Sequence, residues 1–321
     1  MSLPQTPSLL DLSTTTLPFT GLGSLRSVRH QPEPGWLWQQ LHHKRWYYFS
    51  AADDSLLIGC SIVNLGYLAK GFVYVADRAS GKMLAHHQAL LPPGPWCQVE
   101  RTPAGGGGAH FRSPTLSLRF VREVSGTYSI RGSAKGLNFA LFLSTTSDPI
   151  VAANRLATAA TSVTENGLAL GVRGFIEINK RRFNMEEAFG GSDFTDGYLP
   201  RHTRWRWANV SGEIHDKSFG MNLVENYMGA CECVVVIDGN ATPLGEAVIE
   251  PPSDPMHAWR VRTTCERVDL TFTPFALHCD DTDLRVIHAR FQQPIGSYSG
   301  RVLDLMIPNI IGVCENQDVL W

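Results

Sequence analysis

The sequence predicts an all-β fold made of two barrel or sandwich units packed together. Apolar and polar residues alternate with a period of two, and Gly, Pro, Asp or Asn interrupt the pattern about every 8–12 residues. Helical stripes of useful length are scarce. The chain has 321 residues, of which 43% are hydrophobic and 18% charged, as in globular proteins. We count about fifteen strands, which is too many for one small barrel.

The strands are assigned from runs of alternation bounded by turn residues. In the first half they are predicted at 55–63, 72–77, 82–90, 115–123, 127–132 and 137–144. The Thr-, Ser- and Ala-rich stretch 145–166 is predicted to be a linker or a short helix. Further strands are predicted at 168–179, 203–210, 219–226, 231–238, 258–264, 267–274, 284–291 and 298–306. We therefore place the N-terminal β-barrel unit at 1–165 and the C-terminal unit at 166–321, with the break somewhere between about 145 and 200.

Charge and cysteine usage exclude several classes of protein. Lys and Arg total 28 against 30 Asp and Glu, so the net charge of −2 provides no field that would attract nucleic acid. No stretch approaches the roughly 20 apolar residues of a membrane span, and the N-terminus lacks a secretory pattern. Seven scattered cysteines indicate reduced thiols and a cytoplasmic location. The pattern does not indicate an oligomeric state.

Motifs for common cofactors are missing from the sequence. There is no GxxxxGK[ST], GxGxxG or HExxH, and the GxSxG-like string 296–300 has Tyr298 at the nucleophile position. The pair Cys231 and Cys233 has no second ligand pair nearby. We therefore expect no cofactor and no metal.

The segment 193–226 contains the candidate site. If 203–208 is extended, Trp205 and Trp207 cover one face of the strand, and Arg204 and Arg206 cover the other. In the functional interpretation these residues line a cavity, where a desolvated Glu moves a proton and Arg stabilises charge. The predicted catalytic residues are Glu225 and Arg204. The predicted substrate-binding residues are Arg206, Asn222, Tyr198, Trp205, Trp207 and Asp193.

Each of these assignments has a structural alternative. The arginines are equally typical of a half-buried strand braced by ion pairs or facing solvent. Asp193 equally fits a turn cap.

Several ordered strings of residues resemble a known family. They are KRWYYFS (44–50), IVNLGY (62–67), ADR (76–78), RHTRWRWA (201–208), GMNLVE (220–225) and IPNIIGVCE (307–315). Together they resemble the family called domain of unknown function 2804 over nearly the whole chain. More distantly, the chain resembles the calycin-like group that includes the carotenoid 1,2-hydratases. That resemblance implies two lipocalin-like units and an apolar pocket in or between them. The tail departs from the family pattern, because Asn316 and Gln317 stand where an acidic residue followed by His is commoner.

Two functions follow from the pattern and the resemblance. The first is an enzyme that binds a hydrophobic small molecule and acts on it by cofactor-free acid–base chemistry, as a hydratase, isomerase or cyclase. The second is a non-catalytic carrier or sensor of an apolar ligand. A carboxyl group with a raised pKa inside an apolar pocket favours the enzyme, whereas a pocket of aliphatic residues and Arg favours the carrier. A third hypothesis is that the protein holds no ligand and serves as a platform for protein interactions.

Overall fold

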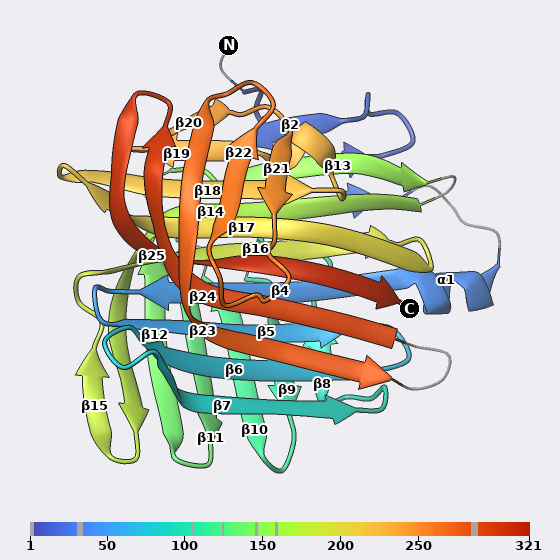
Figure 1. The fold of residues 1–321 in the computed structure, drawn as a ribbon. Helices are drawn as coiled ribbons and strands as arrows, with labels where there is room; N and C mark the ends of the chain where they lie inside the picture. The colour runs from blue at the N-terminus through green and yellow to red at the C-terminus, as the bar shows by residue number, and fades with distance from the viewer. Residues whose placement is uncertain are drawn as a thin grey trace.

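The computed structural model describes residues 3–30, 35–104, 106–123, 125–144, 147–157, 160–283 and 288–321. These residues form two large antiparallel sheets that curl and pack against each other, which confirms the predicted all-β, two-unit architecture (Figure 1). No helix among the described residues is long and apolar enough to cross a bilayer.

The first sheet has 14 strands among the described residues. Its main path runs β7-β6-β5-β4-β16-β14-β12-β11-β10-β9-β8, and β13, β15 and β2 pair at its side. The strands are β2 (Phe19–Leu22), β4 (His43–Ala52), β5 (Leu56–Asn64), β6 (Ala69–Asp77), β7 (Lys82–Leu91), β8 (Cys97–Val99), β9 (Gly108–Arg112), β10 (Leu116–Arg122), β11 (Tyr128–Ala134), β12 (Leu137–Ser144), β13 (Ile150–Ala157), β14 (Ala160–Ile178), β15 (Arg181–Asn184) and β16 (Ala188–Tyr198).

The second sheet has nine strands in the described part of the chain, in the order β20-β19-β18-β17-β25-β24-β23-β22-β21. They are β17 (His202–Ile214), β18 (Lys217–Glu225), β19 (Val234–Ile237), β20 (Asn240–Pro243), β21 (Ala247–Glu250), β22 (Trp259–Thr263), β23 (Val268–Asp283), β24 (His288–Val302) and β25 (Leu305–Leu320). The remaining elements are the pair β1 (Leu10–Asp11) and β3 (Val28–Arg29), helix α1 (Trp36–His42) and the single-turn helix η1 (Gly229–Glu232).

Each sheet encloses its own core. In the first sheet, Phe49 on β4 packs edge-on against Phe120 on β10, with ring centroids 5.0 Å apart, although four strands separate β4 from β10. The sheet therefore curls back on itself around this core. In the second sheet, Phe272 on β23 packs against Tyr298 on β24 and Trp259 on β22.

A third apolar cluster lies between the two sheets. Tyr47 and Phe49 of β4 point into the first core, whereas Tyr48 points the other way and meets Trp207 of β17 edge-on, with centroids 5.3 Å apart. Neighbouring side chains of a strand alternate between faces, so β4 is buried on both sides. In Figure 1 the orange and red strands β23–β25 lie across the blue strands β4–β6 at this junction.

The stretch 145–166 was wrongly predicted as a linker or short helix. Its described part forms the hairpin strand β13 and the first third of β14, paired from Ile150 to Asn166. Among its described small polar residues, Thr161, Ser162 and Thr164 are buried, and the first two have partners. Thr161 contacts His30, and Ser162 contacts Tyr227. Sequence polarity was therefore misleading because tertiary partners satisfy these hydroxyl groups.

Three other predictions from the sequence have residue bounds that differ from those of the structure or extend beyond its described residues. The predicted boundary between 165 and 166 lies inside β14, whereas the chain passes from one sheet to the other between Tyr198 and His202. The division into domains itself stays a prediction. The predicted strand 231–238 begins with η1 and is extended from Val234. Of the predicted strand 284–291, residues 284–287 lie outside the described residues, and β24 begins at His288.

Candidate functional site

A pocket of about 150 Å³ lies between the two sheets. A cavity of that size holds a benzene-sized group. The first sheet contributes side chains from β4, β5, β6, β7 and β16, and the second from β17, β18, β23, β24 and β25. Its aliphatic and phenyl side chains are Val63, Leu65, Leu68, Phe72, Leu90, Val224, Ala289, Phe291 and Val319.

Three aromatic rings form one wall of this pocket. Trp46 of β4 stacks on Trp205 of β17, with centroids 5.9 Å apart and an interplanar angle of 11°. Tyr227 lies 5.5 Å from Trp205 and 6.3 Å from Trp46, centroid to centroid. We call Trp46, Trp205 and Tyr227 the aromatic wall. It spans both sheets, so the packing of the sheets creates it.

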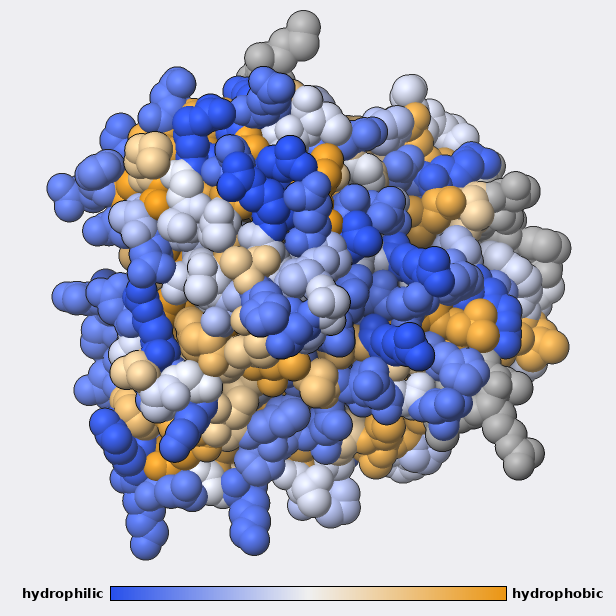
Figure 2. Space-filling view, in the orientation of Figure 1, coloured by the Kyte–Doolittle hydropathy of each residue, from blue (hydrophilic) through white to orange (hydrophobic). Residues whose placement is uncertain are grey.

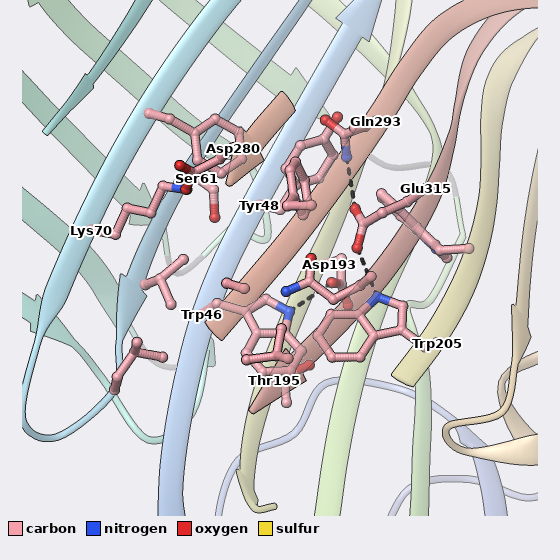
Figure 3. A pocket seen from close by; sticks show the side chains of 18 of the residues that line it. Trp46, Tyr48, Ser61, Lys70, Asp193, Thr195, Trp205, Asp280, Gln293 and Glu315 are labelled. Atoms are coloured by element: carbon pink, nitrogen blue, oxygen red, sulfur yellow. Dashed lines mark hydrogen bonds and ion pairs between the residues drawn. The ribbon is translucent and has the colours of Figure 1, made fainter. Parts of the chain in front are cut away.

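Glu315 of β25 places a buried carboxyl group at this wall (Figure 3). Its Oε1 accepts a hydrogen bond from Trp205 Nε1 at 2.7 Å, and its Oε2 accepts one from Gln293 Nε2 at 2.9 Å. Burial raises the pKa of Glu315 to about 8, even though both hydrogen bonds favour the ionised form. Near neutral pH this group is therefore an acid that still holds its proton.

A chain of polar side chains leads away from Glu315 into the first sheet. Tyr74 donates its hydroxyl hydrogen bond to Gln293 Oε1 at 2.6 Å, and the hydroxyl groups of Tyr48 and Tyr74 lie 3.1 Å apart. Tyr48 itself lines the pocket. Glu315 is thereby fixed by residues of β24, β6 and β4.

Two further acids line the pocket. Asp193 of β16 accepts a hydrogen bond at Oδ2 from Trp46 Nε1 at 2.9 Å, and Glu232 of η1 accepts one at Oε1 from Asn166 Nδ2 at 3.0 Å. Burial raises the pKa of both groups, and the charge of Asp193 raises the pKa of Glu232 and of Glu315 further. The three carboxyl groups therefore disfavour simultaneous ionisation.

The positive charge on the pocket lining comes from Lys70 of β6, and it is already paired. Lys70 donates to Asp280 of β23, next to the rings of Phe72 and Phe291. This ion pair links the two sheets. It leaves Asp193, Glu232 and Glu315 without a salt bridge among the described residues.

The family model described as Domain of unknown function (DUF2804) matches residues 25–321. The chain belongs to this family. A search of the curated proteins gives no match.

Solved structures with a similar fold include three described proteins. A protein described as AttH from Nitrosomonas europaea aligns at a TM-score of 0.54 and 14% identity, over 87% of this chain and 93% of its own. CghA in complex with Sch210972 aligns at 0.55 and 12% identity, over 99% and 98% of the two chains. Kievitone hydratase from Nectria haematococca aligns at 0.49 and 8% identity, over 88% and 90%. At these identities the likeness to AttH and CghA shows the fold alone.

In this DUF2804 protein, three of the residues singled out from the sequence lie on the pocket: Trp205, Trp207 and Asp193. Asp193 is in the middle of β16 and does not cap a turn. Asn222 lies behind the lining, where its Oδ1 accepts a hydrogen bond from Trp207 Nε1 at 2.7 Å. The expected alternation of Trp and Arg along β17 is present.

The other predicted residues do not line the pocket. Arg204 is exposed, and its Nε donates to Asp318 Oδ2 at 2.8 Å. Arg206 pairs with Glu225 at 2.9 Å, next to β21. The geometry therefore gives no support to catalysis by Arg204 and Glu225, which stays a prediction.

Tyr198 is buried away from the pocket, on the face of β16 opposite Asp193. Its ring stacks on His43 at 4.8 Å and meets His30 edge-on at 5.2 Å. His30 and His43 also contact Asp196, and this contact holds the pKa of Asp196 below its usual value although burial alone would raise it. Tyr198 thus belongs to a separate polar cluster next to α1.

Sequence reasoning missed Glu315, Glu232 and Gln293. Each is a buried polar residue with a buried neighbour in the chain, as Glu315 has Cys314 on β25. For Glu315 the available signal was an acid directly after the apolar run that ends at Cys314, because burying an acid is costly. The Cys231–Cys233 pair flanks Glu232, and the Cys231 thiol donates to the carbonyl oxygen of Met228. The described residues contain no group of three or more His, Cys, Asp or Glu suited to a metal ion.

Proposed function

We propose that this protein binds an apolar small molecule between its two sheets and acts on it by cofactor-free acid–base chemistry, with Glu315 as the proton donor. The reaction class is hydration, isomerisation or cyclisation, so the protein would be a lyase or isomerase. The observation that carries the proposal is a protonated, buried carboxyl group in a pocket lined mainly by apolar and aromatic side chains.

The hydrogen bonds of Glu315 suit it to donate a proton into the cavity. Both carboxyl oxygens already accept hydrogen bonds from fixed N–H groups. Among the hydrogen bonds of the described residues, none has Glu315 as the donor. The acidic proton is therefore available to a ligand atom, and a pKa near 8 lets the group give and regain it near neutral pH.

The alternative is a carrier or sensor that leaves its ligand unchanged. The sequence linked a carrier to a pocket of aliphatic residues and Arg, whereas the described lining of this pocket contains four carboxyl groups and no Arg. That chemistry favours the enzyme. We keep a cytoplasmic location as part of the proposal, because all seven cysteines are free thiols.

The test compares three proteins purified without detergent: the wild type, Glu315→Gln and Arg204→Ala. Organic extracts of each are analysed by mass spectrometry. We expect the same apolar compound from the wild type and from Arg204→Ala, whose substituted side chain lies on the surface. Glu315→Gln should retain a different compound, the unconverted substrate, related to the first by one water or by isomerisation.

Two results would contradict the proposal. The same compound in all three proteins would indicate a carrier. No enriched compound in any of them would remove the support for a ligand pocket.

A further inference from the structure

Some of the buried side-chain oxygen atoms that line the pocket have no hydrogen-bond donor among the described residues. Three buried side-chain oxygens of lining residues have no hydrogen-bond partner in the described structure: Glu232 Oε2, Gln317 Oε1 and Thr195 Oγ1. Gln317 Oε1 can only accept a hydrogen bond, and Glu232 Oε2 can only accept once Glu232 is ionised. Buried acceptors without donors are rare in native proteins. They therefore indicate a ligand that donates hydrogen bonds.

The indole N–H groups of three lining tryptophans are already used within the protein. Trp46 Nε1 donates to Asp193, Trp205 Nε1 to Glu315, and Trp207 Nε1 to Asn222. A ligand made only of acceptors would leave Gln317 Oε1 without a donor, whereas a ligand with N–H groups would supply one.

The charged side chains of the lining also favour a ligand that carries positive charge. The described lining contains four carboxyl groups and one ammonium group, that of Lys70, which is paired with Asp280. Asp193, Glu232 and Glu315 remain without a cation. Burial makes their ionisation unfavourable as long as nothing positive enters the pocket.

The aromatic wall is a third feature of the pocket that favours a positively charged ligand. The ring faces of Trp46, Trp205 and Tyr227 attract positive charge through their quadrupoles, and tryptophan does so most strongly. In Figure 3 Asp193 lies beside the indole rings of Trp46 and Trp205, with Thr195 close by. A cation against this wall meets ring faces on one side and carboxyl oxygens on the other.

We propose that the ligand of this pocket is an apolar amine, whose protonated nitrogen lies against the aromatic wall and donates hydrogen bonds to Asp193 and Glu232. This inference rests on the proposed function and specifies its substrate class. The hydrocarbon part of the amine packs on the aliphatic lining, and the reacting part lies at Glu315.

The test uses three probes that match a benzene-sized cavity and differ in their polar ends: benzylamine, benzyl alcohol and benzoate. Their binding to the full chain is measured by isothermal titration calorimetry at neutral pH. We expect the amine to bind at least about tenfold more tightly than the alcohol, and the carboxylate to bind more weakly than both. This comparison within the wild type does not depend on any variant being folded.

Isosteric variants then locate the nitrogen. Asp193→Asn and Glu232→Gln should each weaken amine binding by about tenfold and leave alcohol binding unchanged, because each removes a negative charge at constant shape. Arg262→Ala is the surface control: Arg262 forms an exposed ion pair with Glu250 outside the pocket lining, so this variant should bind all three probes as the wild type does.

Two results would overturn the inference. If the alcohol binds as tightly as the amine, the cation is not recognised, and the apolar pocket of the proposed function still stands. If none of the three probes binds, the amine class is wrong, and the extraction experiment decides separately whether the proposed function survives.

Discussion

The indole N–H of Trp205 donates to Glu315 over 2.7 Å, which joins the candidate acid to the aromatic wall. The two residues lie on the neighbouring strands β17 and β25, and Gln293 on β24 holds the second carboxyl oxygen. Three adjacent strands of the second sheet therefore fix the position of Glu315. Such fixation is what a proton donor needs, because its proton must already point at the reacting atom.

Replacing Glu315 by Gln should change how stability depends on pH. The ordinary pKa of 4.5 is raised to about 8 by burial in the folded protein. Between these values the folded state holds a proton that the unfolded state has lost, so the free energy of unfolding falls as pH rises through this window. The variant lacks this contribution. Its stability relative to the wild type should therefore increase from about pH 5 to 8, by up to about 1.4 kcal/mol per pH unit.

Urea unfolding of both proteins at several pH values measures this difference. A constant gap between the two curves across the window would show that Glu315 ionises normally. Asp318→Asn is the control: that exposed carboxyl group has a lowered pKa from its contacts with His202 and Arg204, so its contribution changes below the window.

Trp205→Phe should raise the pKa of Glu315 further. The indole N–H stabilises the ionised carboxylate, and Phe retains an aromatic ring without that donor. Titration of the glutamate carboxyl carbons by ¹³C NMR measures the shift. Trp207→Phe serves as a control, because its indole donates to the amide oxygen of Asn222 instead of a carboxyl group. An unchanged or lower pKa in Trp205→Phe would argue against this hydrogen bond.

Arg122→Met should strongly destabilise the first sheet. Arg122 Nη1 and Glu165 Oε1 lie 2.6 Å apart, and their side chains are 5% and 1% exposed. Removing the arginine leaves a buried carboxyl group without its cation, at an expected cost of about 3–5 kcal/mol in urea unfolding at neutral pH. Adding Glu165→Gln should recover part of this loss: burial raises the pKa of Glu165 to about 7 even beside Arg122, so without the arginine it must take up a proton or stay unpaired, and Gln avoids both. Equal stability of the single and double variants would contradict this account.

Much of the fold could be predicted because alternation along a strand is a local property. The strands around 55–63 and 72–77 agree with β5 and β6 for this reason. The packing of the two sheets was expected from the number of strands. The position of β13 and β14 was missed, because buried Thr161 and Ser162 resemble linker residues until His30 and Tyr227 are placed beside them.

The candidate site could be predicted only in part. The alternation along β17 placed Trp205 and Trp207 on one face, and the structure puts that face on the pocket. Local sequence cannot show which face is buried, so Arg204 and Glu225 were assigned roles on the opposite side. Glu315 lies 110 residues from Trp205 in the chain. Their meeting depends on the pairing of β17 with β25, which no local pattern encodes.

Gly59→Ala should disrupt the polar chain that reaches Glu315 from the first sheet. A Cβ atom at Gly59 would collide with the ring end and hydroxyl group of Tyr74, which is fully buried and donates to Gln293 at 2.6 Å. Packing on all sides leaves the tyrosine little room to move, so we expect a loss of about 1–3 kcal/mol in urea unfolding. Gly171→Ala is the matched control, since its Cβ would meet no atom closer than 3.8 Å.

A double-mutant cycle with Tyr74→Phe separates this collision from a general effect of alanine in β5. Phenylalanine lacks the hydroxyl group that the added Cβ meets, so Gly59→Ala should cost less in the Tyr74→Phe background than in the wild type. Additive costs would show that the hydroxyl group takes no part in the collision, since phenylalanine keeps the ring carbon Cζ that the added Cβ also meets. A positive coupling would place Tyr74 where the structure has it, between Gly59 and the amide that holds Glu315.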